Sequence, residues 1–342
     1  MLPWFGAAAD PGRVHTEGHA ARVAVEVARE QVGALLGCRG SREVVFTSGA
    51  TESIATATWM ATERGAHVVV PAVEHSAVRE SSAMFGESTI VGVDRVGRVA
   101  VDDVLGALRP DTALVHVQWG NHEVGTLQPV AEIVAACRER GVLVHVDAAM
   151  AAGHVPIDFA ALGADLLSVS AHKLGGPPGV GALLVRRGLR LRPLLVGGDQ
   201  ERARRSGFEN VPAIVGFGAA ADAIVPGDDE RRLIQRVIDG ADLEVLGDAA
   251  ASLPHLVCLG IDGVEAEPVL VALDQAGVAV HSGSSCSSEA LEPSPVLEAM
   301  GRDASRSLRV SIGWSSTDAD VDALLRALPD VLARLRALGE RA

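Results

Sequence analysis

Lysine is almost absent from this chain of 342 residues, and tyrosine is missing altogether. Of its 30 Lys and Arg residues, 29 are arginines and only one, Lys173, is a lysine. Arginine stays protonated in proteins and cannot act as an amine nucleophile, whereas a partly buried lysine can. A lysine kept at one position of such a chain indicates a need for the ε-amine itself, as in a Schiff base. A surface lysine kept by chance is the alternative.

Other scarcities exclude whole classes of partner. Aromatic residues make up only 3% of the sequence, which argues against a stacking platform for single-stranded nucleic acid. The net charge of −14 argues against non-specific binding to nucleic acid or to an anionic membrane. No apolar run approaches the ~20 residues that a membrane span needs. The N-terminus has neither the basic start nor the apolar run of a signal peptide.

Cysteines are few as well, and they are widely spaced: Cys38, Cys137, Cys258 and Cys286. None forms a C-x-x-C pair, and no Cys/His spacing resembles a zinc site, so we expect no metal. Without an export signal, the sequence predicts a reduced, cytoplasmic protein with free thiols.

Short runs rich in Val, Leu and Ile alternate with helical segments over the first two-thirds of the chain. Such continuous apolar strands between helices predict a mainly parallel sheet that is covered on both faces. Ligands bind to sheets of this kind at the carboxyl ends of the strands. The strands are expected at 43–47, 67–71, 89–93, 113–118, 143–147, 165–170 and 182–186.

The pattern changes after about Ala223. A long charged segment, 228–253, has helical periodicity and contains no strand signal. Beyond it we expect strands at 256–261, 278–280 and 308–312, and helices at 265–276 and 318–338. The sequence therefore predicts a large α/β domain at 10–223 and a smaller C-terminal α+β domain at 224–342.

Chemistry-bearing residues follow several of the expected strands. The segment 47–52 joins a strand to a helix, where backbone N–H groups and hydroxyls suit a phosphate, although an ordinary N-cap fits equally. Asp147 could pair with a pyridinium nitrogen or cap the next segment. His75 could stack on a flat ring and move protons near neutral pH, or it could be structural.

Two further residues point to an amino-acid substrate. Cys286 lies in a run of small polar residues, where we expect an accessible loop, and thiol reactivity requires exposure. Arg309 lies in an apolar run and needs an anionic partner, either a substrate carboxylate or an internal acid. Taken with Lys173, these features indicate pyridoxal phosphate chemistry on an amino acid, with a cysteine that receives a group.

From about residue 10 to residue 338, the chain resembles the class V aminotransferase superfamily, and within it the group I cysteine desulfurases. The resemblance implies a fold type I structure with a seven-stranded sheet, a homodimer, and conversion of L-cysteine to L-alanine. The motifs that carry it are TSGATES (47–53), VEHSAV (73–78), NHEVGTLQPV (121–130), HVDAA (145–149), SVSAHKLGGPPGVGALLV (168–185), GGDQERARRSG (197–207), SGSSCSSEALEPSPVLEAMG (282–301) and LRVSIG (308–313).

The resemblance also implies residue roles. Lys173 would form the Schiff base with pyridoxal 5'-phosphate, Asp147 would pair with its ring nitrogen, and His75 would stack on the ring and help to transfer protons. Cys286 would attack the substrate sulfur and carry it as a persulfide to an acceptor protein. The phosphate would be held by Ala50, Thr51, Ser170 and His172, the substrate would be bound by Asn121 and Arg309, and His122 and Met150 would lie at the cofactor.

The chain departs from the family pattern in four places. The family usually has a second Asn at His122, a Gln that bonds the ring hydroxyl at Met150, and at Phe208 a Thr that reaches the neighbouring subunit's phosphate. Met150 cannot replace the hydrogen bond between this Gln and the ring hydroxyl, which is worth ~1 kcal/mol. Family members also open with a short strand and a Thr-containing segment that we expect to be absent here.

These departures predict weaker cofactor retention, altered substrate choice or low activity. They leave two alternatives open beside the desulfurase. One is another PLP-dependent lyase or transferase on the same scaffold, such as a selenocysteine or cysteine lyase. The other is a non-catalytic scaffold derived from the enzyme. The sequence does not identify the sulfur acceptor.

Overall fold

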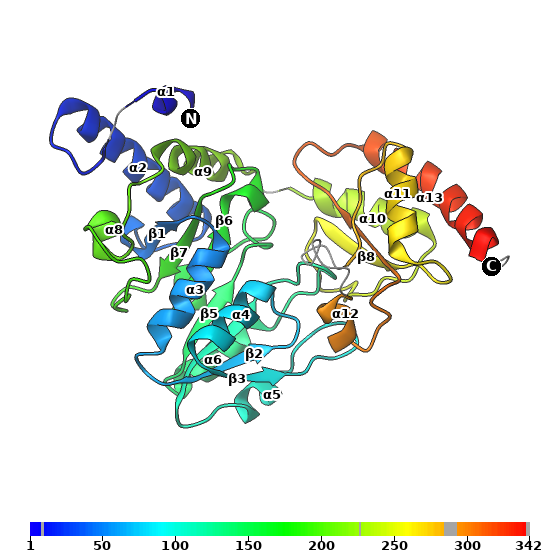
Figure 1. The fold of residues 1–342 in the computed structure, drawn as a ribbon, viewed down its shortest axis with the longest axis horizontal. Helices are drawn as coiled ribbons and strands as arrows, with labels where there is room; N and C mark the ends of the chain where they lie inside the picture. The colour runs from blue at the N-terminus through cyan, green and yellow to red at the C-terminus, as the bar shows by residue number, and fades with distance from the viewer. Residues whose placement is uncertain (8–9, 226, 284–292, 340–342) are drawn as a thin grey trace. The chain divides into compact units, whose positions relative to one another are not determined.

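Seven strands form one sheet in the order β1-β7-β6-β5-β4-β2-β3 (Figure 1). The computed structural model describes residues 1–7, 10–225, 227–283 and 293–339. Within the sheet only β7 runs antiparallel to its neighbours, so the prediction of a mainly parallel seven-stranded sheet is confirmed. The strands are β1 Val44–Thr47, β2 His67–Pro71, β3 Glu87–Val91, β4 Thr112–Gln118, β5 Leu143–Asp147, β6 Leu166–Ser170 and β7 Gly181–Val185.

Helices cover both faces of this sheet, which is why its inner strands are buried along almost their whole length. On one face, Val45 and Leu114 pack with Ile54 of α3 in a buried cluster. On the other face, the ring of Phe46 meets Phe217 of α9 edge-on, with ring centroids 6.3 Å apart. The helices that accompany the sheet are α1 Leu2–Phe5, α2 Thr16–Leu35, α3 Ala50–Ala61, α4 Ser76–Phe85, α5 Val101–Gly106, α6 Val130–Glu139, α7 Phe159–Leu162, α8 Gln200–Ala203 and α9 Val211–Ala223, with short 3₁₀ turns η1 Ser41–Glu43 and η2 Ala171–Leu174.

Contacts divide the chain into two units. Unit 1 comprises Met1–Val91, Val101–Trp119 and Pro129–Pro226, and unit 2 comprises Gly92–Ala100, Gly120–Gln128 and Gly227–Ala342. The short segments 92–100 and 120–128, which the sequence assigned to the large domain, therefore belong to unit 2. The reason is local pairing: Gly120 bridges Leu127, and Thr126 bridges Ser252 of unit 2.

Unit 2 is built on a two-stranded antiparallel sheet. The strands β8 Leu256–Gly260 and β9 Ser307–Ser311 pack with three helices around an apolar core. Among the described residues of this unit, no helix is long and apolar enough to cross a membrane, and the same holds for unit 1. The helices are α10 Asp229–Ala241, α11 Ala266–Gln275, α12 Pro295–Ala299 and α13 Asp318–Gly339.

Two expectations for unit 2 were wrong. The helix expected at 228–253 ends at Ala241, because Asp242 takes a left-handed φ of 53° and Leu246 then bonds to the edge of β8. The strand expected at 278–280 does not form. The N–H of Val278 bonds back to Leu273 to close α11, and only a single bridge at His281 follows.

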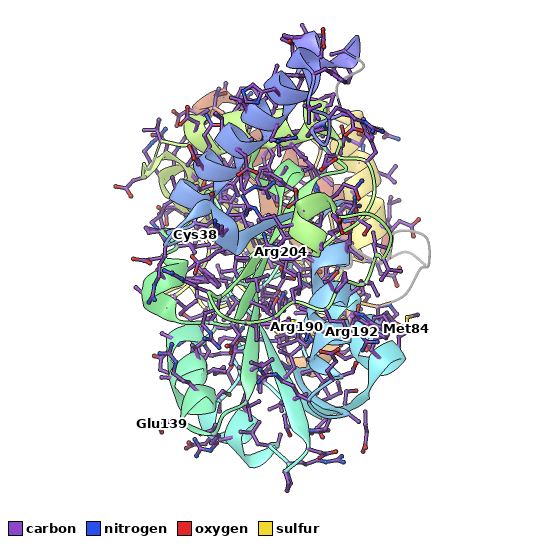
Figure 2. All side chains as sticks on the ribbon, turned by 90° about the vertical axis from the view of Figure 1, so that its left-hand side faces the viewer. Cys38, Met84, Glu139, Arg190, Arg192 and Arg204 are labelled. Atoms are coloured by element: carbon purple, nitrogen blue, oxygen red, sulfur yellow. The ribbon has the colours of Figure 1, made fainter. Side chains whose placement is uncertain are left out.

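Arginine is used where a planar group with several donors is needed. Arg29 makes a buried two-bond contact with Glu201, at 2.6 and 2.8 Å. The guanidinium of Arg192 stacks 3.7 Å above the ring of Trp59, and Arg204 donates to the carbonyls of Arg42 and Val44. Figure 2 shows Arg192 and Arg204 on one side of unit 1. Lysine could not supply these contacts, since its ammonium is a point charge.

Two histidines face each other inside the sheet. His116 of β4 and His145 of β5 are paired in register and fully buried, with Nδ1 atoms 2.9 Å apart. The Nε2 atom of His116 lies 3.2 Å from the Thr58 hydroxyl. Burial lowers the pKa of His116 to about 3. Burial, and after it the neighbouring His116, lowers the pKa of His145 well below its usual value.

These histidines predict that stability falls in mild acid. Below about pH 6.5 the two histidines bind protons in the unfolded chain but stay unprotonated in the native state. Their contribution to the free energy of unfolding is therefore complete above that pH and is lost as the pH falls toward 3. Each histidine that stays neutral in the native state makes the free energy of unfolding fall by about 1.4 kcal/mol for each pH unit of acidification. We expect His116→Gln to reduce the pH dependence of the unfolding free energy by up to about 1.4 kcal/mol per pH unit, measured by denaturant titration between pH 7 and 4.5. Equal slopes in the variant, the wild type and an exposed control, His19→Gln, would contradict this.

Candidate active site

Five strand ends meet at one edge of the sheet of unit 1. β1, β2, β4, β5 and β6 all run in the same direction, so their carboxyl ends share that edge. Ligands of parallel sheets bind there. The functional side chains expected from the sequence follow these ends and belong to the turn at 48–51, His75, Asp147 and the segment 170–173.

The turn between β1 and α3, which we name the anion turn, has groups that suit a negative charge. No side chain caps the N-terminus of α3, and Thr51 is exposed there. A Cβ on Gly49 would lie 3.5 Å from the Ser170 hydroxyl, so the turn adjoins the end of β6. The Ser170 hydroxyl lies 3.0 Å from Nδ1 of His172. The uncapped start of α3, the Ser170 hydroxyl and the His172 imidazole therefore lie near one another, where the helix dipole favours a negative charge.

The environment of His172 favours its neutral form. Burial, and after it the positive charge of Lys173, lowers the pKa of His172 below its usual value. The neutral ring offers one donor and one acceptor, so it can bind an anion through a hydrogen bond.

Asp147 and Lys173 follow neighbouring strands at this edge. Asp147 is 8% exposed, and its Oδ1 atom accepts the N–H of Ala149 at 3.0 Å and the hydroxyl of Ser168 at 3.4 Å. These bonds fix the plane of the carboxylate. Lys173 is exposed on η2, and its carbonyl lies 3.1 Å from Nε2 of His154. The structure thus presents an oriented acid and the chain's one ε-amine on the same edge.

His75 is held as the cap of α4. Its Nδ1 atom accepts the N–H of Ala77 at 3.0 Å, so the neutral ring carries its proton on Nε2.

The residues that hold the turn before His75 were missed by sequence reasoning. Gln118, at the end of β4, donates Nε2–H to the carbonyl of Val73 at 2.7 Å. The N–H of Gln118 bonds to the buried carboxylate of Glu74 at 2.6 Å. The one available signal was a polar residue at the end of an apolar strand.

Three of the expected residues lie in unit 2. Asn121 is fully buried, and its Oδ1 atom accepts the N–H groups of Glu123 and Val124, both at 2.8 Å. His122 is 8% exposed, and its carbonyl accepts a bond from Nη1 of Arg309 at 3.0 Å. Arg309 lies on β9. Unit 2 thus brings His122 and Arg309 together, while Asn121 shapes the turn that presents His122.

Cys286 lies outside the described residues. The other three cysteines are poor nucleophiles, because burial raises the pKa of Cys38 and Cys258 to about 12 and that of Cys137 to about 11. A thiol with such a pKa carries almost no thiolate at neutral pH. This agrees with the expectation that these three thiols pack rather than react.

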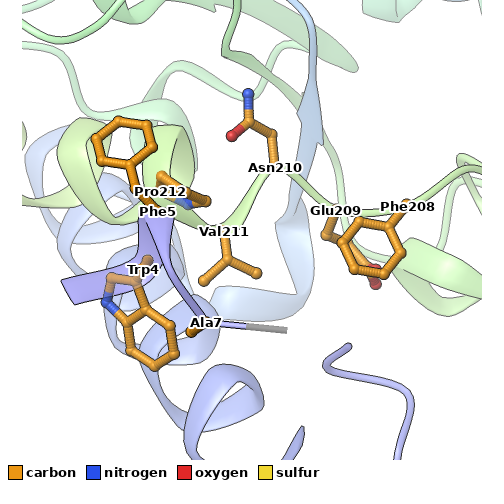
Figure 3. Close-up of a pocket in the computed structure, with 8 residues that line it drawn as sticks. All are labelled: Trp4, Phe5, Ala7, Phe208, Glu209, Asn210, Val211 and Pro212. Carbon is orange, nitrogen blue, oxygen red and sulfur yellow. The ribbon is translucent and has the colours of Figure 1, made fainter. Parts of the chain in front are cut away.

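Phe208 lies beside the anion turn. It lines a cavity of about 220 Å³ together with Ser48 and Arg205, and Arg205 bonds Glu52 at 2.9 Å. It also lines a second cavity of about 370 Å³, whose wall includes Trp4 and Phe5 (Figure 3). Phe208 is 67% exposed, and Met150 is half-buried beyond Asp147. Neither side chain can donate a hydrogen bond to an anion or a ring hydroxyl.

Known proteins are similar to this chain over most of its length. The Aminotransferase class-V family matches residues 6–324. The chain belongs to this family, among its cysteine desulfurases. A cysteine desulfurase from Gluconacetobacter diazotrophicus is 40% identical, over 98% of this chain and 90% of that protein. A NifS-like protein of known structure is 31% identical with a TM-score of 0.88, over 96% of this chain and 93% of that one. The structure of SspA in complex with cysteine has a TM-score of 0.82 at 29% identity, over 91% and 92% of the two chains.

The hydrogen bond of Gln118 leads to a prediction. Gln118→Ala releases the turn that carries His75, so we expect it to slow the consumption of L-cysteine about tenfold while it lowers the unfolding free energy by about 1 kcal/mol. Gln128→Ala is the matched control, because its buried Nε2–H donates to the carbonyl of Gly97 at 2.8 Å. Equal turnover in the two variants would show that Gln118 does not support the site.

Proposed function

We propose that this chain is a PLP-dependent cysteine desulfurase, which converts L-cysteine to L-alanine and moves the sulfur to Cys286 as a persulfide for an acceptor protein. One observation carries the proposal. The anion turn, Asp147 and the chain's one lysine, Lys173, lie at the carboxyl edge of a single sheet. The cysteine desulfurases that resemble the chain along nearly its whole length support it.

The residues at this edge fit pyridoxal 5'-phosphate. The uncapped start of α3, with Ala50 and Thr51, suits the phosphate, and Ser170 and His172 complete that site. Asp147 suits the ring nitrogen, and the amine of Lys173 suits the aldehyde. When bound, the cofactor supplies an electron sink for bond changes next to the substrate nitrogen. Met150 offers no donor to the ring hydroxyl, so we expect weaker retention of the cofactor.

The chain's own residues would then carry out the remaining steps. His75 holds a proton at Nε2 and can stack on the ring, and the Arg309 guanidinium can bind the substrate carboxylate through paired bonds. The Cys286 thiolate attacks the substrate sulfur: an S–S bond forms, and the Cβ–S bond of the substrate breaks. The carbon then takes up a proton, which leaves alanine and a persulfide on Cys286.

Replacement of Cys286 tests the reaction. We expect Cys286→Ala to lower alanine release from L-cysteine by at least about a hundredfold, with no persulfide detected by mass spectrometry. The cofactor absorbance should be unchanged. Cys38→Ala is the control, because burial raises the pKa of that thiol and we expect normal turnover. Full turnover in Cys286→Ala would favour a cysteine or selenocysteine lyase, the reading that His122 and Met150 motivate.

The scarcity of lysine allows a clean control for the cofactor. Borohydride reduction of the purified protein should leave a pyridoxyl group on the peptide that contains Lys173, and Lys173→Ala should lack both this tag and the absorbance. A protein that takes up no added cofactor would instead be a non-catalytic scaffold.

We propose that the active enzyme is a homodimer, and unit 1 carries the surface that supports this. Phe5, Val196 and Phe208 are 66%, 80% and 67% exposed, and exposed apolar groups of this size are typical of interfaces. We therefore expect Phe208→Asp to raise the dimer dissociation constant at least about tenfold, measured by light scattering. Met84→Asp is the control, on a residue that is 77% exposed on α4 and labelled in Figure 2. An unaltered dimer in Phe208→Asp would place the interface elsewhere.

We infer a cytoplasmic location as well. Cys38, Cys137 and Cys258 are free thiols in the described part of the chain, as is usual in a reducing compartment. The proposed chemistry needs the same condition, because the Cys286 thiol must be reduced before each turnover.

A further inference from the structure

The segment 284–292, which carries Cys286, is flanked by two residues that are anchored in unit 2. On its N-terminal side, the backbone of His281 exchanges two hydrogen bonds with Arg309 of β9, at 2.6 and 3.2 Å. Two residues later, the N–H of Gly283 donates to the Ser307 hydroxyl at 3.0 Å. Ser307 is fully buried, so this side of the segment is fixed to β9 by backbone and side chain together.

The C-terminal side is fixed through Ser294. Its hydroxyl oxygen accepts the N–H of Leu297 at 3.0 Å and so caps α12. The same hydroxyl donates its hydrogen to Oε2 of Glu123. Ser294 has no exposed surface. One hydroxyl therefore supplies a hydrogen bond both to a backbone N–H at the start of α12 and to a buried carboxylate.

Glu123 bonds the C-terminal anchor of the segment and lies beside the N-terminal one. Its side chain is 2% exposed, and a Cβ added to Gly283 would lie 3.3 Å from the same Oε2 atom that Ser294 contacts. Its other oxygen, Oε1, lies 3.5 Å from Nε2 of His122. A buried carboxylate is costly unless polar partners surround it, and here those partners include the Ser294 hydroxyl and the neighbouring His122.

Its backbone is held as firmly as its side chain. The N–H of Glu123 donates to Oδ1 of Asn121 at 2.8 Å, and the N–H of Gly125 donates to the carbonyl of Asn121 at 3.0 Å. Gly125 has a φ of +81°, a conformation that favours glycine. The turn therefore leaves the carboxylate little freedom to follow a shift of Ser294 or Gly283.

We propose that Glu123 is a positioning residue, whose carboxylate holds Ser294, the C-terminal anchor of the Cys286 segment, in fixed relation to His122 and to the adjacent N-terminal anchor, Gly283. This rests on the proposed function in one respect only, that Cys286 receives the sulfur. Glu123 acts through the segment, so its loss should slow sulfur transfer and leave cofactor binding intact.

Hydrogen exchange tests the anchor without any assay of activity. In Glu123→Gln and Ser294→Ala, amides of 281–283 and 294–299 should exchange at least about fivefold faster, while unit 1 is unchanged. Glu43→Gln is a control with another buried carboxylate, and Asn210→Ala is a control that removes a helix cap, since Asn210 caps α9. Ser294→Thr keeps the hydroxyl and should restore slow exchange. Unchanged exchange at 281–283 and 294–299, or equal acceleration of these amides in the controls, would overturn the proposal.

Kinetics test the consequence for sulfur transfer. We expect Glu123→Gln to lower kcat for alanine release about tenfold and to leave KM and the cofactor absorbance unchanged. In a Cys286→Ala background the same change should have no further effect, because both act on one step. A joint loss of cofactor and of the melting temperature would reduce Glu123 to a structural role and overturn the proposal. If the wild type releases no alanine, the desulfurase function itself fails, and the exchange measurements still decide whether Glu123 holds the anchors.

Discussion

The parallel register of β4, β5 and β6 is the constraint on which the site of unit 1 depends. It pairs Gln118 with Asp147 and Asp147 with Ser168, in one row across three strands. A slip of one residue would turn these side chains to the opposite face of the sheet. The buried strands around them oppose such a slip, because it would also carry apolar side chains away from their helices. The packing of the buried strands thus determines which side chains stand at the functional edge of the sheet.

Much of this edge was predictable from the sequence, because strand ends are marked locally. Apolar runs ended at Asp147 and Ser170, and the one lysine stood just beyond. The supporting contacts were not predictable. Gln118 meets Val73 across 45 residues of chain, and Ser294 meets Glu123 across 171. No local pattern encodes a hydrogen bond between segments that only the folded chain brings together.

The errors in unit 2 have a similar origin. The segment 242–253 is charged and free of strand signals, which is typical of a helix, yet the edge of β8 offers its backbone better partners. Asn121 was expected to bind substrate. Its amide oxygen holds a turn. Substrate contact by this residue stays a prediction, as does the assignment of Cys286. The polar motif around Asn121 was recognised from the sequence. Which of its residues shapes the turn and which faces a ligand depends on tertiary contacts.

The anchoring of Gly283 and Ser294 bears on how the enzyme could change over evolution. The entropic cost of closing a flexible loop between two fixed points grows slowly with its length, and a doubling costs only about 0.6 kcal/mol. Insertions or deletions there would therefore leave the fold intact. Related enzymes could adapt that stretch to different recipients of sulfur while the catalytic edge of the sheet stayed the same.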